Sequence, residues 1–266
     1  MQIVLLTALG VGGATVIGAV IGFIFKNISH KFSDIVLSFA AGVMLAAAVF
    51  GLILPAATEY GGKYGILIAI GGIFLGAICL NLIDKLVPHL HKLAGIRDDG
   101  VIAKDQIDCV ECERHQNNAK LNKVLLFVLA IAIHNLPEGI AAGVGFGSGY
   151  TTEALVIAGG IALQNIPEGM VIIGPMLAAG LSKKRTFIYA MITGLVEVVG
   201  TLIGYFAVSV AAAILPYALA FAGGTMLYVI SDEMIPETHA HGSQRGATYA
   251  LLVGFSLMLA FDILLG

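Results

Sequence analysis

Residues 124–147 are VLLFVLAIAIHNLPEGIAAGVGFG, an apolar run interrupted by one polar hexapeptide. The run is long enough for a helix to cross the hydrocarbon core of a bilayer, which needs roughly 20 residues. Ionisable side chains such as His134 and Glu138 cost a few kcal/mol each in that environment, so they are retained there for function. The segment therefore predicts a membrane-spanning helix that carries a functional polar motif.

The composition of the whole chain agrees with a membrane protein. Of its 266 residues, 58% are hydrophobic and only 12% are charged, which lies outside the usual balance of a soluble domain. The 34 glycines fit helices that pack closely in lipid. The net charge of −3 argues against a nucleic-acid partner, because the chain has no basic stripe to neutralise phosphates. The expected surrounding of most of the chain is the lipid bilayer.

Apolar runs bounded by charged or turn residues predict an all-α polytopic membrane protein with eight transmembrane helices. We expect these helices at residues 3–25, 34–57, 64–83, 124–147, 153–180, 187–210, 213–231 and 249–265. The first is a spanning helix and not a secretory signal, because no basic residue precedes its apolar stretch. Residues 1–266 then form a single transmembrane domain, with a polar cytosolic loop at about residues 84–123.

The basic residues predict how this domain is oriented. Thirteen of the fourteen Lys and Arg residues fall in the loops after the first, third, fifth and seventh expected helices, and Lys63 alone falls on the other side. Lys and Arg in short loops stay in the cytosol. The distribution predicts that both termini lie outside the cell, an N-out/C-out topology in the cell membrane.

The polar hexapeptide has a second copy. HNLPEG begins at His134, and QNIPEG occupies 164–169 in the next expected helix. Residues four positions apart lie on one helix face, so His134 shares a face with Glu138, and Gln164 shares one with Glu168. Two such faces on neighbouring helices can converge on one ion.

Other residues of these helices strengthen the prediction of an ion site. Pro137 and Pro167 each remove a backbone donor and are expected to kink their helices, which frees carbonyl oxygens nearby. Glu197 adds a third acid within the apolar stretch GLVEVVG of the sixth helix. Three buried carboxylates without a nearby Lys or Arg would repel one another, and a divalent cation removes that conflict. A metal site between helices 4, 5 and 6 is therefore expected.

The donor set indicates which metals fit. One imidazole with carboxylates and amide oxygens suits zinc, manganese, iron(II) or cobalt better than calcium or magnesium, which prefer only oxygen. Zinc is the first choice, and cadmium is a further alternative. The metal is expected as transported substrate; no other cofactor is predicted, and the absence of a nucleotide-binding loop argues against ATP as the driving force.

On these motifs the chain resembles the ZIP (Zrt-, Irt-like protein) family of metal transporters, over nearly its whole length. The resemblance implies uptake of divalent transition metal into the cytosol by alternating access, in an elevator-like form. It also implies two metals, one bound by His134, Glu138, Gln164, Asn165 and Glu168 and a second bound by Asn135, Glu138, Asn165, Glu168 and Glu197. Met44, in AGVMLAA, resembles the thioether ligand of some bacterial members.

The resemblance extends to both ends of the expected pathway. A cytosolic exit is implied in SDEMIPETHAH, with the ligands Asp232, Glu233, Glu237, His239 and His241. Asp262, near the C-terminus, is implied at the entrance. One position departs from the family pattern: Asn165 stands where close bacterial relatives can have Asp, and this loss of charge weakens the case for two bound metals.

Other interpretations stay open at this stage. His134 or Glu197 taken alone could be a packing residue, and Met44 could be ordinary core. Cys109 and Cys112 form one CxxC in the loop, which lacks the second half of a zinc finger. For the whole chain the alternatives are an intramembrane metal-dependent hydrolase, although no HExxH occurs, and a passive divalent-cation channel. We predict a transporter and not an enzyme, and the sequence leaves homodimer formation open.

Overall fold

The computed structural model of this chain describes residues 1–25, 29–93, 129, 132–146, 151–178, 180–210 and 212–265. These residues are helical or lie in turns, and none of them forms a strand. Within them, seven helices are long and apolar enough to cross a membrane. The all-α class of a polytopic membrane protein is confirmed, whereas the count of eight spans stays a prediction.

Most of the expected helices are found close to their predicted positions. The first three are α1 (Gln2–Ile24), α2 (His30–Ala46) with its continuation to Tyr60, and α3 (Gly65–Leu93). The later ones are α5 (Thr151–Ala178), α6 (Lys183–Val210), α7 (Leu215–Val229) with its continuation to His239, and α9 (Gln244–Leu265). Of the expected helix 124–147, residues 132–146 are described and are helical.

Several boundaries differ from the prediction. Helix α2 begins at His30 because the hydroxyl of Ser29 caps it by accepting a hydrogen bond from the Phe32 amide, at 3.2 Å. Helix α3 continues to Leu93, beyond its predicted end at residue 83, although the part apolar enough to span a membrane ends at Ile83. The cytosolic loop at about residues 84–123 stays a prediction. Residues 94–128, which hold most of that loop and its CxxC, lie outside the described residues.

The seventh expected helix is the most altered. It was predicted to end at residue 231, but a π-helical turn, η5 (Ile230–Met234), leads directly into α8 (Ile235–His239). Gly242, with a φ of +83°, then makes the turn toward α9. Two more π-helical stretches, η1 (Ala47–Ile53) and η2 (Ala56–Tyr60), continue α2 on either side of Leu54 and Pro55. Periodicity did not predict these widened turns, which often occur at functional sites.

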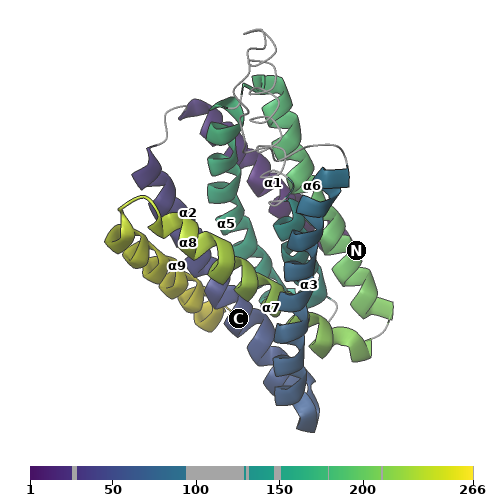
Figure 1. Ribbon diagram of the computed structural model, residues 1–266. Coiled ribbons are helices and arrows are strands. Elements are labelled where there is room, and N and C mark those ends of the chain that lie inside the picture. Colours follow the sequence, from purple (N-terminus) through teal and green to yellow (C-terminus); the bar gives the residue numbers. More distant parts are fainter. Residues whose placement is uncertain are drawn as a thin grey trace.

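The helices pack as two groups. The first group holds α1, α5, α6 and helix 132–146, and the second holds α2, α3, α7 and α9. In Figure 1, α1 (purple) runs beside α5 (teal), and α2 runs beside α9 (yellow). Helices α2 and α5 also pack together and join the two groups.

Glycine allows close helix packing inside each group. In the first group, a Cβ on Gly18 of α1 would overlap the Ile166 carbonyl of α5, and one on Gly139 would overlap the Glu197 carbonyl of α6. In the second group, Gly42 of α2 meets the Leu251 carbonyl of α9 in the same way. Backbones approach this closely only where no side chain intervenes. These contacts hold helices 132–146, α5 and α6 together around the candidate site.

The distribution of polar and apolar side chains fits a bilayer. Large apolar side chains such as Leu6 at 70% and Val210 at 86% are exposed on the outside of the bundle. Buried polar residues, among them Thr15, Gln164 and Glu197 at 0% exposure, lie inside it. Contiguous exposed apolar surface of this kind faces lipid.

Candidate metal centre

Helix 132–146 and α5 bury both copies of the polar motif. Asn135, Glu138, Gln164 and Asn165 are fully or almost fully buried, and His134 is 9% exposed. Glu168 is half-buried. Both helices are continuous through Pro137 and Pro167, and the kinks expected there stay a prediction.

The structure brings the predicted side chains of the three helices together. Glu138 lies close enough to interact with Gln164, Glu168 and Glu197, and Glu168 lies close enough to interact with His134. Among the described residues, however, no three His, Cys, Asp or Glu side chains converge to metal-ligand distances. The ligands are thus neighbours across the helix interfaces, without a closed coordination shell.

The Glu197 carboxylate is surrounded by hydrogen-bond donors. Its Oε1 accepts from the Thr15 hydroxyl at 2.6 Å and from the Asn135 amide at 2.5 Å. Its Oε2 accepts from the Asn165 amide at 2.5 Å. Hydrogen bonds to a carboxylate stabilise its charge in a buried site. Four helices of the first group therefore meet at this one side chain.

Several other polar atoms of the motif have no such partner. Both oxygens of Glu138, both amide atoms of Gln164, and the carbonyl oxygens of Asn135 and Asn165 are buried without a hydrogen bond to the described residues. Buried polar atoms are almost always hydrogen-bonded, so a group of exceptions needs an explanation. Except for the Gln164 nitrogen, these atoms are carboxylate or amide oxygens, which can serve as ligands of a divalent cation.

His134 has a neighbour from outside the first group. Its Nε2 lies 2.7 Å from Oε1 of Glu233, which the π-helical turn η5 supplies. The prediction put Glu233 at the cytosolic exit and His134 in the central site. The structure joins the two positions in one contact.

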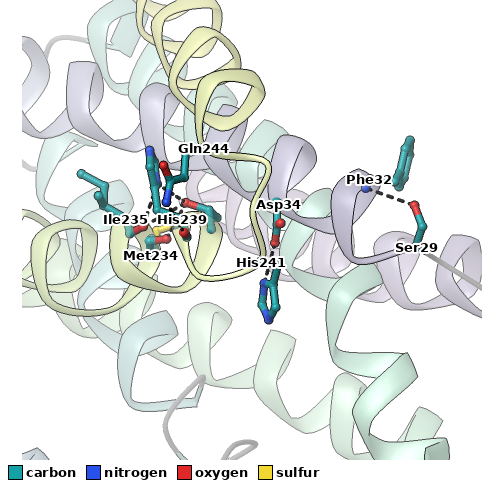
Figure 2. Close-up of polar contacts among 9 residues, drawn as sticks. Ser29, Phe32, Asp34, Met234, Ile235, His239, His241 and Gln244 are labelled. Atoms are coloured by element: carbon teal, nitrogen blue, oxygen red, sulfur yellow. Dashed lines mark hydrogen bonds and ion pairs between the residues drawn. The ribbon is translucent and has the colours of Figure 1, made fainter.

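The remaining predicted exit residues lie apart from this contact. Nδ1 of His241 lies 3.1 Å from Oδ1 of Asp34 of α2, a carboxylate oxygen that can accept a hydrogen bond from it, and Figure 2 shows the two side chains facing each other. His239 has both ring nitrogens engaged, one with the Ile235 carbonyl and the other with the Thr248 hydroxyl. Asp232 and Glu237 are exposed.

The predicted entrance residue borders a cavity. Asp262 lines a space of about 190 Å³ together with Glu59, Tyr60 and Glu153. Asp262 and Glu153 are near enough to interact. Three acidic side chains therefore line the cavity, at the opposite end of α2 from Asp34.

Met44 is buried in the main apolar core. It is 1% exposed and shares a cluster with Ala141 and Ile161, each three residues from a motif position on its own helix. Met44 therefore lies near the motifs. The same position also fits an ordinary residue of the apolar core.

Sequence reasoning missed four polar residues of these sites, namely Thr15, Asp34, Glu59 and Glu153. A threonine in an apolar helix is not unusual, so nothing in the sequence set Thr15 apart. Asp34 also gave no signal in the sequence, and only the structure shows that it is 3% exposed and that its Oδ2 has no partner among the described residues. Glu59 and Glu153 stand at helix ends, where charged residues are ordinary.

Comparison with known proteins identifies the family. The family model described as ZIP Zinc transporter matches residues 103–262. Zinc transporter GufA of Myxococcus xanthus is 39% identical to this chain over 267 residues, with 98% of each chain covered. Zinc transporter ZIPB of Bordetella bronchiseptica is 36% identical over 95% of this chain and 78% of its own length.

A third relative gives the same result. Zinc transporter ZupT of Chlorobaculum parvum is 34% identical over 96% of this chain and 94% of its own. These proteins are transporters, and the matching chain has several membrane-spanning helices, so a multi-pass membrane protein that is not an enzyme is confirmed. The chain belongs to the ZIP zinc transporter family.

Proposed function

We propose that this chain carries a divalent transition metal, zinc first, across the cell membrane into the cytosol. The observation that carries the proposal is the group of buried, unpartnered acceptor atoms on Glu138, Gln164, Asn135 and Asn165. Such atoms inside membrane helices cost free energy unless they bind an ion during part of the cycle. The relatives are named zinc transporters, which supports zinc as the substrate.

In the proposed mechanism the metal is bound between helices 132–146, α5 and α6. His134 and the carboxylates of Glu138 and Glu168 replace water on the ion, and the amide oxygens complete its shell. Met44 is a further candidate ligand from α2. The entering ion is first attracted by the acids around Asp262, and it leaves past Glu233 toward Asp232, Glu237, His239 and His241.

The proposed topology has eight spans with both termini outside. Seven of these spans are the long apolar helices described above, and the remaining one, fourth along the chain, is the helix that includes residues 132–146. The placement of Lys and Arg supports this orientation, because Lys183, Lys184 and Arg185 lie together at the α5–α6 turn while the acidic cavity lies at the other end.

Alternating access would come from movement of one helix group against the other. The two groups are each held by glycine contacts between backbones, which resist internal sliding. Between them, the contacts at Gly51 and Gly160 are made with the side chains of Ile157 and Met258. Side-chain contacts can be exchanged in a rigid-body movement, which supports an elevator-like mechanism.

Transport by purified protein in liposomes tests the proposal. A metal-sensitive dye inside the vesicles should report saturable zinc influx, and Glu138→Ala or His134→Ala should reduce it to the background of empty vesicles. Lys184→Gln, an exposed position near the start of α6 that lies outside the proposed pathway, is the control and should retain influx. Wild-type influx of zinc by both site variants, or a response to magnesium alone, would refute the proposed function. Very fast flux without saturation would indicate a channel.

A further inference from the structure

Glu197 differs from the other acids of the centre in how its charge is satisfied. Its Oε1 accepts two hydrogen bonds, from Thr15 and Asn135, and its Oε2 accepts one from Asn165. Each carboxylate oxygen has about two lone-pair directions, so Oε1 is fully used. Glu138, by contrast, has no close donor at either oxygen among the described residues; the Gln164 side chain is near enough to interact with it but makes no well-aligned hydrogen bond.

The two asparagines are fixed in one orientation by this arrangement. The Asn135 amide nitrogen also donates to the Thr193 carbonyl at 3.4 Å, and the Asn165 amide nitrogen also donates to the Val11 carbonyl at 3.2 Å. Each NH₂ group therefore meets two acceptors, and reversing either amide would set its oxygen against them. The carbonyl ends point away from Glu197, and both Oδ1 atoms are buried without a partner among the described residues.

We propose that Glu197 is a positioning residue: together with Thr15 it orients Asn135 and Asn165 so that their Oδ1 atoms serve as neutral ligands of a single metal ion. The inference rests on the proposed function and deepens it. A second ion bound by Asn135, Asn165 and Glu197 together would need the amide oxygens on the side of Glu197. In the structure the amide nitrogens lie on that side. Binding it would require both amides to turn and to give up their four hydrogen bonds.

The charges of the centre agree with one ion. Glu138 and Glu168 supply two negative charges for a divalent cation, while the charge of Glu197 is stabilised by three donors. Asn165 takes part in this balance, because an aspartate there would lose the donor to Glu197 and set two carboxylates against each other. Glu197 thus fixes the geometry of the asparagine ligands from outside the coordination shell. Within the shell, the charges of Glu138 and Glu168 balance one divalent cation.

The Thr15 hydroxyl gives a direct test, since it contacts the site only through Glu197. The Thr15 backbone carbonyl packs against Gly169 of α5, and a side-chain substitution leaves that carbonyl in place. Thr15→Val keeps the shape and removes the hydroxyl donor, and Thr15→Ser restores the donor. Thr201→Val is the matched control, because the Thr201 hydroxyl donates only to the backbone carbonyl of Glu197 within α6, at 2.9 Å. For zinc influx in liposomes, we expect Thr15→Val to raise KM roughly tenfold, with kcat changed less than about twofold. Thr15→Ser and Thr201→Val should stay near wild type.

A variant cycle separates positioning from ordinary packing. In a Glu197→Gln background, Thr15→Val should have no further effect on KM, because its partner is already altered. Additive effects of the two substitutions, or a wild-type KM for Thr15→Val, would overturn the proposal.

Metal stoichiometry supplies a readout independent of transport. Equilibrium dialysis of purified protein against zinc, with wild type compared to Glu138→Gln, should show a difference of one ion per chain. A difference of two ions would overturn the single-ion proposal while leaving the proposed function intact. Failure of the wild-type protein to carry zinc would instead refute the proposed function, so the two failures are distinguishable.

Discussion

At the scale of single residues, His134 can have two partners that exclude each other. Its Nε2 lies 2.7 Å from Glu233, and the same nitrogen is a candidate metal ligand. An imidazole nitrogen that binds a metal must be deprotonated and free of another partner. Glu233 therefore competes with the metal when the metal binds and can replace it when the metal leaves.

Glu233→Gln should separate these two effects. Without the competing carboxylate, zinc should bind more tightly and leave more slowly, so both KM and kcat of influx should fall. Because the Glu233 side chain is 35% exposed, we expect a change of about threefold and not the full value of a buried charged hydrogen bond. Liposome kinetics would measure both constants, with Lys184→Gln as control. A raised KM with unchanged kcat would contradict the competition.

Competition between protons and metal gives a pH dependence. Imidazole and carboxylate ligands bind a metal only when they are deprotonated, so protons compete with zinc for the site. KM for zinc influx should therefore rise as the pH falls. Influx measured over a series of pH values at fixed zinc activity tests the prediction, and a KM that does not change with pH would refute it.

At the scale of helices, backbone contacts at glycine hold the first group together. Gly18 of α1 faces the Ile166 carbonyl of α5, so the two helices meet beside the second polar motif. A methyl group at this position must push them apart, and both the packing and the hydrogen bond from Asn165 of α5 to the Val11 carbonyl of α1 depend on their closeness. The spacing of α1 from α5 is therefore part of the site.

Gly18→Ala should destabilise the folded protein by about 1–3 kcal/mol, the usual cost of overpacking. Gly13→Ala on the same helix is the control, since nothing lies within 4 Å of a Cβ there. Thermal unfolding in detergent should show a lower midpoint for Gly18→Ala alone. Equal midpoints for the two variants would mean that α1 and α5 are not held by this contact.

At the scale of the whole molecule, the two helix groups are the units whose relative movement we propose. A Cβ built at Gly51 of η1 lies 3.9 Å from the Ile157 Cβ of α5, a separation that suits a disulfide. This pair joins the groups.

Cysteine pairs at these positions test the movement. In a background without Cys79, Cys109 and Cys112, oxidised Gly51→Cys/Ile157→Cys should abolish zinc influx, and reduction should restore it. The single variant Ile157→Cys should transport in either state, because it has no partner thiol with which to form a disulfide. Full influx through protein that is completely crosslinked between the groups would exclude the elevator-like mechanism.

The helices and the polar motifs could be predicted because their signals are local. The length of an apolar run decides whether it can span a bilayer, and the four-residue spacing of His134 and Glu138 decides that they share a helix face. The helix ends were less certain, since the cap at Ser29 and the π-helical turn before α8 depend on a few hydrogen bonds. The family resemblance rested on the same local motifs and was confirmed by the relatives.

Which partner each motif residue has was decided by the tertiary structure. Thr15 meets Glu197 across 182 positions of sequence, and Glu233 reaches His134 from another helix group, so no periodicity could reveal either contact. The sequence by itself determined the membrane class, the spans and the polar residues that a bilayer makes costly. Only helix packing determined which carboxylate is satisfied by donors and which acceptors are left for an ion, because hydrogen bonds depend on distance in space.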